Sequence, residues 1–227
     1  MHFTVKKLGM VPYKEALSIQ EKTQRERIAG NIPDTLLLLE HPSVLTLGKR
    51  TQPGHIRLSD KELCDLGVDV VEINRGGDVT YHGPGQLVGY PIFDLKEHGK
   101  DIRQFVYNLE RVFIRLLQED YAISSHAESD RHTGVFVKEN KITAFGISVH
   151  QWVTMHGFAL NVNTNLSHFD WIVPCGLTDR GVVSIERLTG VTQDMGIITE
   201  RVADLFGLVF GMERVSFDSK EATLKNL

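Results

Sequence analysis

Three strand-forming stretches follow one another in the middle of the chain with almost nothing between them. They span residues 134–138, 141–149 and 153–162. Only Glu139 and Asn140 separate the first two, and asparagine tolerates the positive φ of a tight turn, so we predict a hairpin there. Strands joined by hairpins are incompatible with a regular alternation of strand and helix along the chain. The pattern therefore predicts an α+β fold.

The clearest helix signal lies at residues 101–120, where apolar side chains recur every three or four positions on one face. Ser59 is followed three residues later by Glu62, the pattern of a capping box, which predicts a short helix that carries Cys64. No repeat or linker divides the chain, so we expect a single domain over residues 1–227. The other predicted helices span 12–29 and 195–208, and the other strands span 3–8, 36–40, 44–47, 68–73 and 87–94.

The composition restricts the classes of protein to which the chain can belong. Hydrophobic residues make up 41% and charged residues 24%, as in ordinary globular proteins. The formal net charge of −4 argues against a general nucleic-acid binder. No apolar run approaches the roughly 18 residues of a membrane span, and residues 1–7 lack the apolar core of a signal peptide. With only two cysteines, these features predict a cytoplasmic protein that binds neither nucleic acid nor membranes.

A glycine-rich segment at residues 75–86, between two predicted strands, is the first candidate for a binding site. Its four glycines allow a close approach of the backbone to a ligand. The segment has neither the Gly-Lys-Ser/Thr ending of a phosphate loop nor the helix-opening spacing of a dinucleotide-binding turn. We therefore favour a loop that lines a pocket for a less charged ligand, and a purely structural turn is the alternative. Taken singly, Arg75 and His82 fit a structural role better than a catalytic one.

Cys175 is the candidate nucleophile. It stands between Pro174, which stiffens the chain, and Gly176, which leaves the sulfur uncrowded, and the backbone N–H groups that follow are candidate oxyanion donors. A lone cysteine is more often a small buried side chain, and we interpret Cys64 in that way.

Lys141 is the candidate partner of this cysteine. Most lysines are solvated surface charges, but an ammonium group beside a cysteine lowers the pKa of the thiol and increases the thiolate fraction. The ten histidines show no H-E-x-x-H or C-x-x-C spacing, so we predict no metal site.

Together these segments resemble the lipoyl(octanoyl) transferase family. The match covers roughly residues 35–190, and residues 75–90 fit the long family motif at every fixed position. The supporting segments are Glu40-His41-Pro42, Thr46-Leu47-Gly48, Gly134-Val135, Lys141-Ile142 with Gly146, His156 to Val162, and Pro174-Cys175-Gly176.

The resemblance implies a fold like that of the biotin and lipoate ligases, in which a mixed β-sheet packed with helices forms one wall of an acyl tunnel. It implies that Cys175 carries the acyl thioester and that Lys141 lowers its pKa and shuttles protons, with no metal and no cofactor. The residues that the resemblance assigns to the acyl pocket are Arg75, Gly76, Gly77, Asp78, Val79, Thr80, Tyr81 and His82, together with Ala144, Phe145, Gly146, Gly157, Phe158 and Ala159.

The reaction implied by the resemblance moves an octanoyl group from octanoyl-acyl carrier protein to a lysine of a lipoyl domain, the first step of endogenous protein lipoylation. The acceptors are the lipoyl domains of 2-oxoacid dehydrogenase complexes and the glycine cleavage H protein. Because acyl carriers are acidic, we expect Lys49 and Arg50 to contact the donor. The alternatives are an ATP-dependent lipoate or biotin ligase of the same fold, a non-catalytic acyl-carrier or lipoyl-domain binding protein and, last, a histidine-based metal hydrolase.

Overall fold

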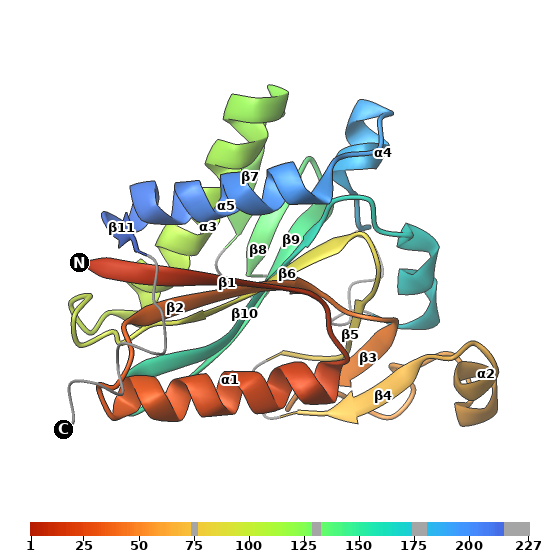
Figure 1. The fold of residues 1–227 in the computed structure, drawn as a ribbon. Helices are drawn as coiled ribbons and strands as arrows, with labels where there is room; N and C mark the ends of the chain where they lie inside the picture. Colours follow the sequence, from red (N-terminus) through yellow and green to blue (C-terminus); the bar gives the residue numbers. More distant parts are fainter. Residues whose placement is uncertain (74–76, 129–132, 174–180, 216–227) are drawn as a thin grey trace.

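The computed structural model describes residues 1–73, 77–128, 133–173 and 181–215, and it contains a large mixed sheet with helices on both faces and a small second sheet (Figure 1). The large sheet consists of β1 (His2–Met10), β2 (Asp34–Glu40), β6 (Gln86–Ile92), β7 (His126–Glu128), β8 (Gly134–Val137), β9 (Asn140–His150), β10 (Val153–Asn161) and β11 (Glu213–Arg214). The small sheet consists of β3 (Val44–Leu47), β4 (Asp69–Glu72) and β5 (Thr80–His82). The helices are α1 (Tyr13–Ile28), α2 (Asp60–Asp65), α3 (Ile102–Tyr121), the 3-10 helix η1 (Leu166–Trp171), α4 (Ile185–Thr189) and α5 (Met195–Phe210).

The strand order of the large sheet is β11-β1-β2-β6-β10-β9-β8-β7. Strand β1 runs parallel to both β11 and β2, and every other neighbouring pair is antiparallel. The antiparallel half contains the predicted hairpins, β8–β9 and β9–β10. Together with the helices, this mixed sheet confirms the predicted α+β fold.

Strand β2 shows how the sheet is buried on both faces. Leu36 and Leu38 belong to the core beneath α3 and α5, whereas Leu37 and Leu39 belong to a second core beneath α1. Successive side chains of a strand point to opposite faces of the sheet. The uninterrupted run of leucines in β2 is therefore explained by helices that cover both faces. Figure 1 shows α1 on one side of the sheet and α5 on the other.

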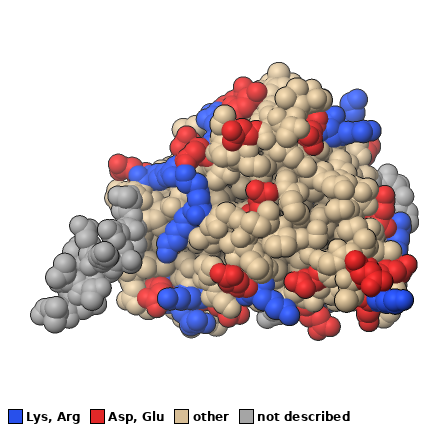
Figure 2. All heavy atoms as spheres, turned by 45° about the vertical axis from the view of Figure 1, so that its right-hand side comes forward, with Lys and Arg blue, Asp and Glu red and all other residues tan. Residues whose placement is uncertain are grey.

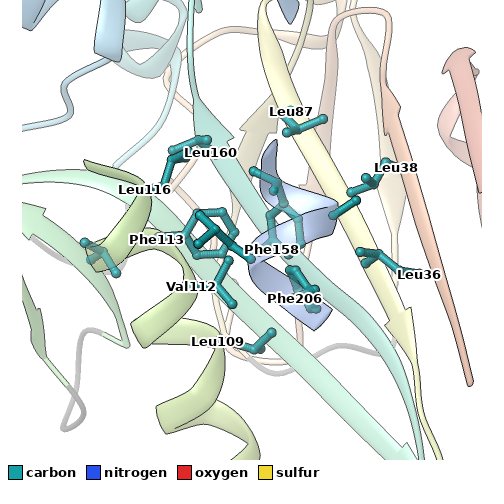
Figure 3. Close-up of a cluster of buried hydrophobic side chains, with 14 of the residues drawn as sticks. Leu36, Leu38, Leu87, Leu109, Val112, Phe113, Leu116, Phe158, Leu160 and Phe206 are labelled. Atoms are coloured by element: carbon teal, nitrogen blue, oxygen red, sulfur yellow. The ribbon is translucent and has the colours of Figure 1, made fainter. Parts of the chain in front are cut away.

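Aromatic rings fill the core beneath α3 and α5. Phe113 of α3 meets Phe158 of β10 with ring centroids 4.6 Å apart, and Phe158 also lies against Phe206 of α5 (Figure 3). Aromatic pairs in such edge-on and stacked arrangements contribute about 0.5–1.5 kcal/mol beyond the area they bury. This packing fixes α3 and α5 against β10, the strand that carries Gly157, Phe158 and Ala159 of the predicted pocket.

Local capping accounts for the starts of α2 and α3. The Asp101 carboxylate accepts hydrogen bonds from the N–H groups of Arg103 and Gln104, so the helix predicted at 101–120 begins at Ile102. The capping box predicted for Ser59 and Glu62 is present at the start of α2.

Three expectations from the sequence were wrong. The positive φ of the β8–β9 turn lies at Lys138 (52°), and Asn140 is already the first residue of β9. Part of the glycine-rich segment forms a strand, β5, because residues 80–82 pair with β3. Cys64 is exposed instead of buried, because the side chain of α2 that enters the core is Leu63.

Figure 2 shows Lys and Arg side chains mixed with Asp and Glu side chains over the face turned forward in that view. This distribution agrees with the small formal net charge of −4. Within the described part of the chain, no helix is both long enough and apolar enough to cross a membrane.

Candidate active site

A cavity of about 340 Å³ is lined by residues of both sheets. Strand β5 of the small sheet provides Thr80 and His82, and strands β6, β9 and β10 of the large sheet provide most of the rest. The volume lies within the range of small-molecule sites, and most of the strand side chains in the wall are apolar. The cavity can therefore hold a small, largely apolar group.

The structure brings most of the predicted site residues together in this cavity. Tyr81 does not line it. The Tyr81 hydroxyl lies 2.7 Å from Nδ1 of His168 and 3.2 Å from Oγ of Ser43, so the side chain points into the core of the small sheet. Cys175, Arg75 and Gly76 lie outside the described residues. The predicted residues that line the cavity are Gly77, Asp78, Val79, Thr80, His82, Lys141, Ala144, Phe145, Gly146, Gly157, Phe158 and Ala159.

Small residues form part of the wall contributed by β9 and β10. Ala144 is the register partner of Ala159, and Gly146 is the partner of Gly157. A Cβ atom added to Gly157 would lie 2.2 Å from the carbonyl oxygen of Gly89 on β6, so the close approach of these strands requires glycine there. The result is a strip of wall without long side chains, which leaves room for a ligand.

Lys141, near the start of β9, is the cationic side chain that β9 contributes to the cavity. Its Nζ atom lies 5.2 Å from the centroid of the Phe136 ring. Gly134 of β8 makes room for it, because a Cβ atom at residue 134 would lie 3.1 Å from Cε of Lys141 and 2.6 Å from the carbonyl oxygen of Thr143. Close contact with Gly134 and Phe136 restricts the directions in which the ammonium group can point.

The backbone of Lys141 also pairs with the chain that follows Cys175. The N–H of Lys141 donates to the carbonyl of Gly181 at 3.0 Å, and the N–H of Val183 donates to the carbonyl of Lys141 at 3.0 Å. Gly181 and Val182 both line the cavity. The segment that contains Cys175 therefore rejoins the described structure beside Lys141.

A row of polar side chains connects β5, β6 and β10 at the cavity. His82 Nδ1 lies 2.7 Å from Oε1 of Gln86, and the Gln86 amide donates to Oδ1 of Asn161 at 2.9 Å. The Asn161 amide donates in turn to the carbonyl of Val183 at 3.2 Å. Because each amide uses both of its ends, the orientation of these three side chains is fixed.

A buried histidine supports the cavity from behind. His41 is fully buried, with Nδ1 2.7 Å from the carbonyl oxygen of Val11 and Nε2 2.7 Å from the hydroxyl of Tyr90, which lines the cavity. Burial lowers the pKa of His41 to about 4. The imidazole is therefore neutral near pH 7, donating to Val11 through Nδ1 and accepting from Tyr90 through Nε2.

Asp78 and Arg50 bring opposite charges to the cavity lining. Asp78 is buried, and its carboxylate accepts hydrogen bonds from Nδ1 of His55 at 2.8 Å and from the N–H of Val79 at 2.6 Å. Arg50 is exposed, and its backbone N–H donates to the carbonyl of Gly77 at 3.0 Å. No group of three or more His, Cys, Asp or Glu side chains suited to a metal ion occurs in the described ranges.

The sequence did not single out several residues that line the cavity. Gln86, Val88 and Tyr90 fall inside the long motif, and His156 and Asn161 fall inside the segment from His156 to Val162, so a signal for them existed. The others come from separate elements, and only the three-dimensional fold brings them together. These additional lining residues include Tyr13, Ile102, Val106, Thr133, Phe136, Ile147, Phe169, Gly181 and Val182.

Comparison with known proteins supports the resemblance. A family model described as the lipoyl protein ligase A/B catalytic domain matches residues 12–207. Curated octanoyltransferases of Caldicellulosiruptor saccharolyticus and Caldicellulosiruptor bescii are 52% and 57% identical to this chain, over 97% and 90% of its length and 94% and 90% of theirs. A putative lipoate protein ligase from T. acidophilum, solved with bound lipoic acid, has the same fold: its TM-score is 0.77 at 14% identity, with 100% of this chain and 94% of that one covered. The chain belongs to the family of lipoyl protein ligase A/B catalytic domains.

Proposed function

We propose that residues 1–227 act as one catalytic domain that transfers an octanoyl group from octanoyl-acyl carrier protein to a lysine of a lipoyl domain, through a thioester on Cys175. Relatives more than 50% identical over at least nine-tenths of the chain are named octanoyltransferases, which supports octanoyl transfer as the activity. The observation that carries the proposal is an apolar cavity in which Lys141 pairs with the chain that follows Cys175.

The first step is an exchange of thioesters. The thiolate of Cys175 attacks the acyl carbon of the donor, and the bond from that carbon to the carrier sulfur breaks. The Lys141 ammonium group gives its proton to that sulfur, so the carrier leaves as a thiol and Lys141 becomes neutral. Because one thioester replaces another, the step is nearly thermoneutral and needs no ATP. The ammonium group of Lys141 favours the thiolate form of Cys175 by opposite charge.

The second step forms an amide. A neutral ε-amine of the acceptor attacks the acyl carbon, the bond to Cys175 breaks, and the amine loses one proton. Once Cys175 is acylated, no thiolate stabilises the charge on Lys141, so the neutral amine of Lys141 can accept that proton and return it to the departing sulfur. An amide is more stable than a thioester, and this difference drives the transfer forward.

The apolar wall explains why a medium-length acyl chain is a suitable substrate. Burial of each CH₂ group contributes about 0.8 kcal/mol. An octanoyl chain in the cavity therefore gains several kcal/mol of binding free energy without any charged contact. The polar groups at His82, Gln86 and Asn161 are directed at one another, as their hydrogen bonds show.

Intact-protein mass spectrometry tests the thioester. Wild type, Cys175→Ala and Cys64→Ala are each mixed with octanoyl-acyl carrier protein in the absence of ATP and acceptor. We expect one octanoyl adduct on wild type and on Cys64→Ala, no adduct on Cys175→Ala, and loss of the adduct when a lipoyl domain is added. Cys64 is the matched control because it is an exposed free thiol outside the cavity. Transfer that requires ATP and survives Cys175→Ala would favour the ligase alternative.

The donor and acceptor named here extend what the relatives' names state. We assign the donor role to an acyl carrier protein and the acceptor role to lipoyl domains of 2-oxoacid dehydrogenase complexes and the glycine cleavage H protein. Lys49 and Arg50 are both exposed, and Arg50 lines the cavity, so an acidic carrier that delivers its acyl group there would meet them.

Reversal of these two charges tests the carrier surface. Lys49→Glu with Arg50→Glu should raise the KM for octanoyl-acyl carrier protein about tenfold and should change the KM for octanoyl-pantetheine, which has no carrier surface, much less. Lys14→Glu with Lys22→Glu, at exposed positions of α1, is the matched control. An unchanged KM for the carrier would refute this assignment.

A further inference from the structure

The loop at residues 48–57 lies between two parts of the site that are far apart in sequence. On one side, the N–H of Arg50 donates to the carbonyl of Gly77, and the imidazole of His55 meets the carboxylate of Asp78, with Nδ1 2.8 Å from Oδ1 and 2.7 Å from Oδ2. These contacts attach the loop to the residues that line the cavity.

On its other side, the same loop pairs with the chain that leads to Cys175. The N–H of Val173 donates to the carbonyl of His55 at 2.8 Å, and the N–H of Arg57 donates to the carbonyl of Trp171 at 2.8 Å. Ile56 and Ile172 form a bridge between these two hydrogen bonds. The loop thus forms a short antiparallel ladder with the backbone that immediately precedes Pro174.

His55 takes part in both sets of contacts through different atoms. Its ring bonds Asp78 on the cavity side, and its main-chain oxygen accepts from Val173, two residues before Cys175. The carboxylate of Asp78 is 6% exposed, and the side chain of His55 is 23% exposed. A buried carboxylate without partners is unfavourable, so the His55–Asp78 contact gives the two segments a preferred relative position.

We propose that His55 is a positioning residue: the His55–Asp78 hydrogen bond fixes the cavity-lining segment against the backbone of residues 171–173, which leads to Cys175. The proposal rests on the function proposed above, because it assumes that the acyl chain bound in the cavity must meet the sulfur of Cys175. His55 itself does not line the cavity. Its effect operates through Asp78 on one side and Val173 on the other.

Two substitutions separate the hydrogen bond from the rest of the ring. His55→Asn retains an N–H donor near the position of Nδ1, whereas His55→Phe retains a ring and removes the donor. Displacement of reacting groups by about 1 Å can cost 10²-fold in rate, so we expect His55→Phe to lower the rate of octanoyl-adduct formation about 10- to 100-fold. His55→Asn should restore most of that rate, because it preserves the bond to Asp78.

The measurements use the whole chain in a Cys64→Ser background, so that Cys175 is its only cysteine. Pre-steady-state mass spectrometry gives the rate of adduct formation and its dependence on donor concentration, and alkylation by iodoacetamide gives the reactivity of Cys175 without any acyl donor. We expect His55→Phe to lower the maximal adduct rate, to change the half-saturating donor concentration by less than about threefold, and to leave the protein folded by circular dichroism.

The outcomes distinguish this inference from the proposed function. If wild type forms the adduct and His55→Phe forms it at the same maximal rate, the positioning role is refuted. If His55→Asn and His55→Phe are both folded and form the octanoyl adduct equally slowly, the imidazole itself is required. That result would refute the hydrogen bond to Asp78 as the cause of the positioning effect. If wild type forms no adduct, the proposed function fails, and equal alkylation rates in wild type and His55→Phe would then refute the positioning role separately.

Discussion

At the scale of single residues, Glu110 is the most unusual side chain of α3. It lies on the buried face of the helix with 5% of its surface exposed, and its Oε1 atom has no hydrogen-bond partner among the described residues. Burial raises the pKa of this carboxyl group above its ordinary value. The folded protein therefore favours the protonated form of Glu110. In the unfolded chain the same carboxyl group has its ordinary pKa.

Glu110→Gln should make the protein more stable at neutral and alkaline pH. Wild-type stability falls as the pH rises from the pKa of the unfolded chain through the raised pKa of the folded state, because the buried carboxyl group must then ionise. A neutral amide avoids this cost, so we expect a gain of about 1 kcal/mol at pH 8, or roughly 2–4 °C in Tm, that shrinks toward pH 4.5.

Thermal unfolding followed by circular dichroism at pH 5 and pH 8 gives the measurement for Glu110→Gln. Glu119→Gln is the control, for which we expect a change in stability of the opposite sign. Arg115 and Arg201 hydrogen-bond Glu119 and lower its pKa, so loss of that charge should destabilise the protein at pH 8. A gain for Glu110→Gln that did not depend on pH would contradict the titration of Glu110 as its cause.

At the scale of elements, β9 and β10 contribute to both the core and the cavity. Phe145 and Phe158 pack against Phe113 of α3 and also line the cavity, while the register partners Ala144 and Ala159 leave space in it. The same two strands therefore build part of the core and part of the binding wall. The cavity dimensions therefore depend on small side chains held by a rigid aromatic layer.

Ala144→Leu should shorten the acyl chain that the enzyme accepts. The three added carbon atoms of leucine project from the wall into the cavity. Overpacking typically costs 1–3 kcal/mol, so kcat/KM for an octanoyl donor should fall roughly 5- to 100-fold. A butanoyl donor should lose much less. The comparison uses octanoyl- and butanoyl-pantetheine with wild type, Ala144→Leu and Ser148→Leu, because Ser148 lies on the same strand outside the cavity lining. Equal losses for both donors would contradict a role of Ala144 in chain length.

Elements with local signals were predictable from the sequence, and elements held by distant partners were not. The capping pattern of Ser59 and the amphipathic pattern of residues 101–120 gave helix starts within a residue, and the hairpins of β8, β9 and β10 followed from their spacing. Strands β5, β7 and β11 have two or three residues each and form only because other strands pair with them. Such pairing depends on the fold and leaves no periodic pattern in so short a segment.

The residues of the candidate site likewise fall into those that the sequence indicated and those that only the fold brings together. Glycine spacing and the family resemblance indicated Gly77, Lys141 and Gly157, because these residues stand in long recognisable motifs. Tyr13 and Ile102 reach the same cavity from helices that carry no such motif. The pairing of His55 with Asp78 joins two loops, and nothing in either loop alone indicates the other.

At the scale of the whole molecule, a buried charge cluster ties α1 to the sheet. Arg27 donates to Asp34 at 2.7 Å and contacts Glu97 at 2.7 Å, and His98 meets the second oxygen of Asp34 at 2.6 Å. The backbone N–H of Asp94 also donates to Asp34 at 2.8 Å. None of these residues lines the cavity, so the cluster contributes to the stability of the fold apart from the chemistry.

Arg27→Met should destabilise the protein without altering the active site. It removes the cationic partner of Asp34 and retains the aliphatic stem, and such a loss at a buried pair costs about 3–5 kcal/mol. We expect the lower end, because His98 and the N–H of Asp94 still contact Asp34. Urea unfolding compares the variant with Arg25→Met, an exposed position of the same helix. A free energy of unfolding equal to that of Arg25→Met would contradict this account.

The pairing of β1 with β11 has a consequence for biosynthesis. The N–H of Glu213 donates to the carbonyl of Met1, and the N–H of Val215 donates to the carbonyl of Phe3, so the first residues of the outer edge of β1 are covered by residues near the opposite end of the described chain. A nascent polypeptide on the ribosome presents that edge, with its unpaired backbone groups, until almost all of the sheet has been translated. The exposed charges of Lys6 and Lys7 on β1 discourage another chain from pairing there in the meantime.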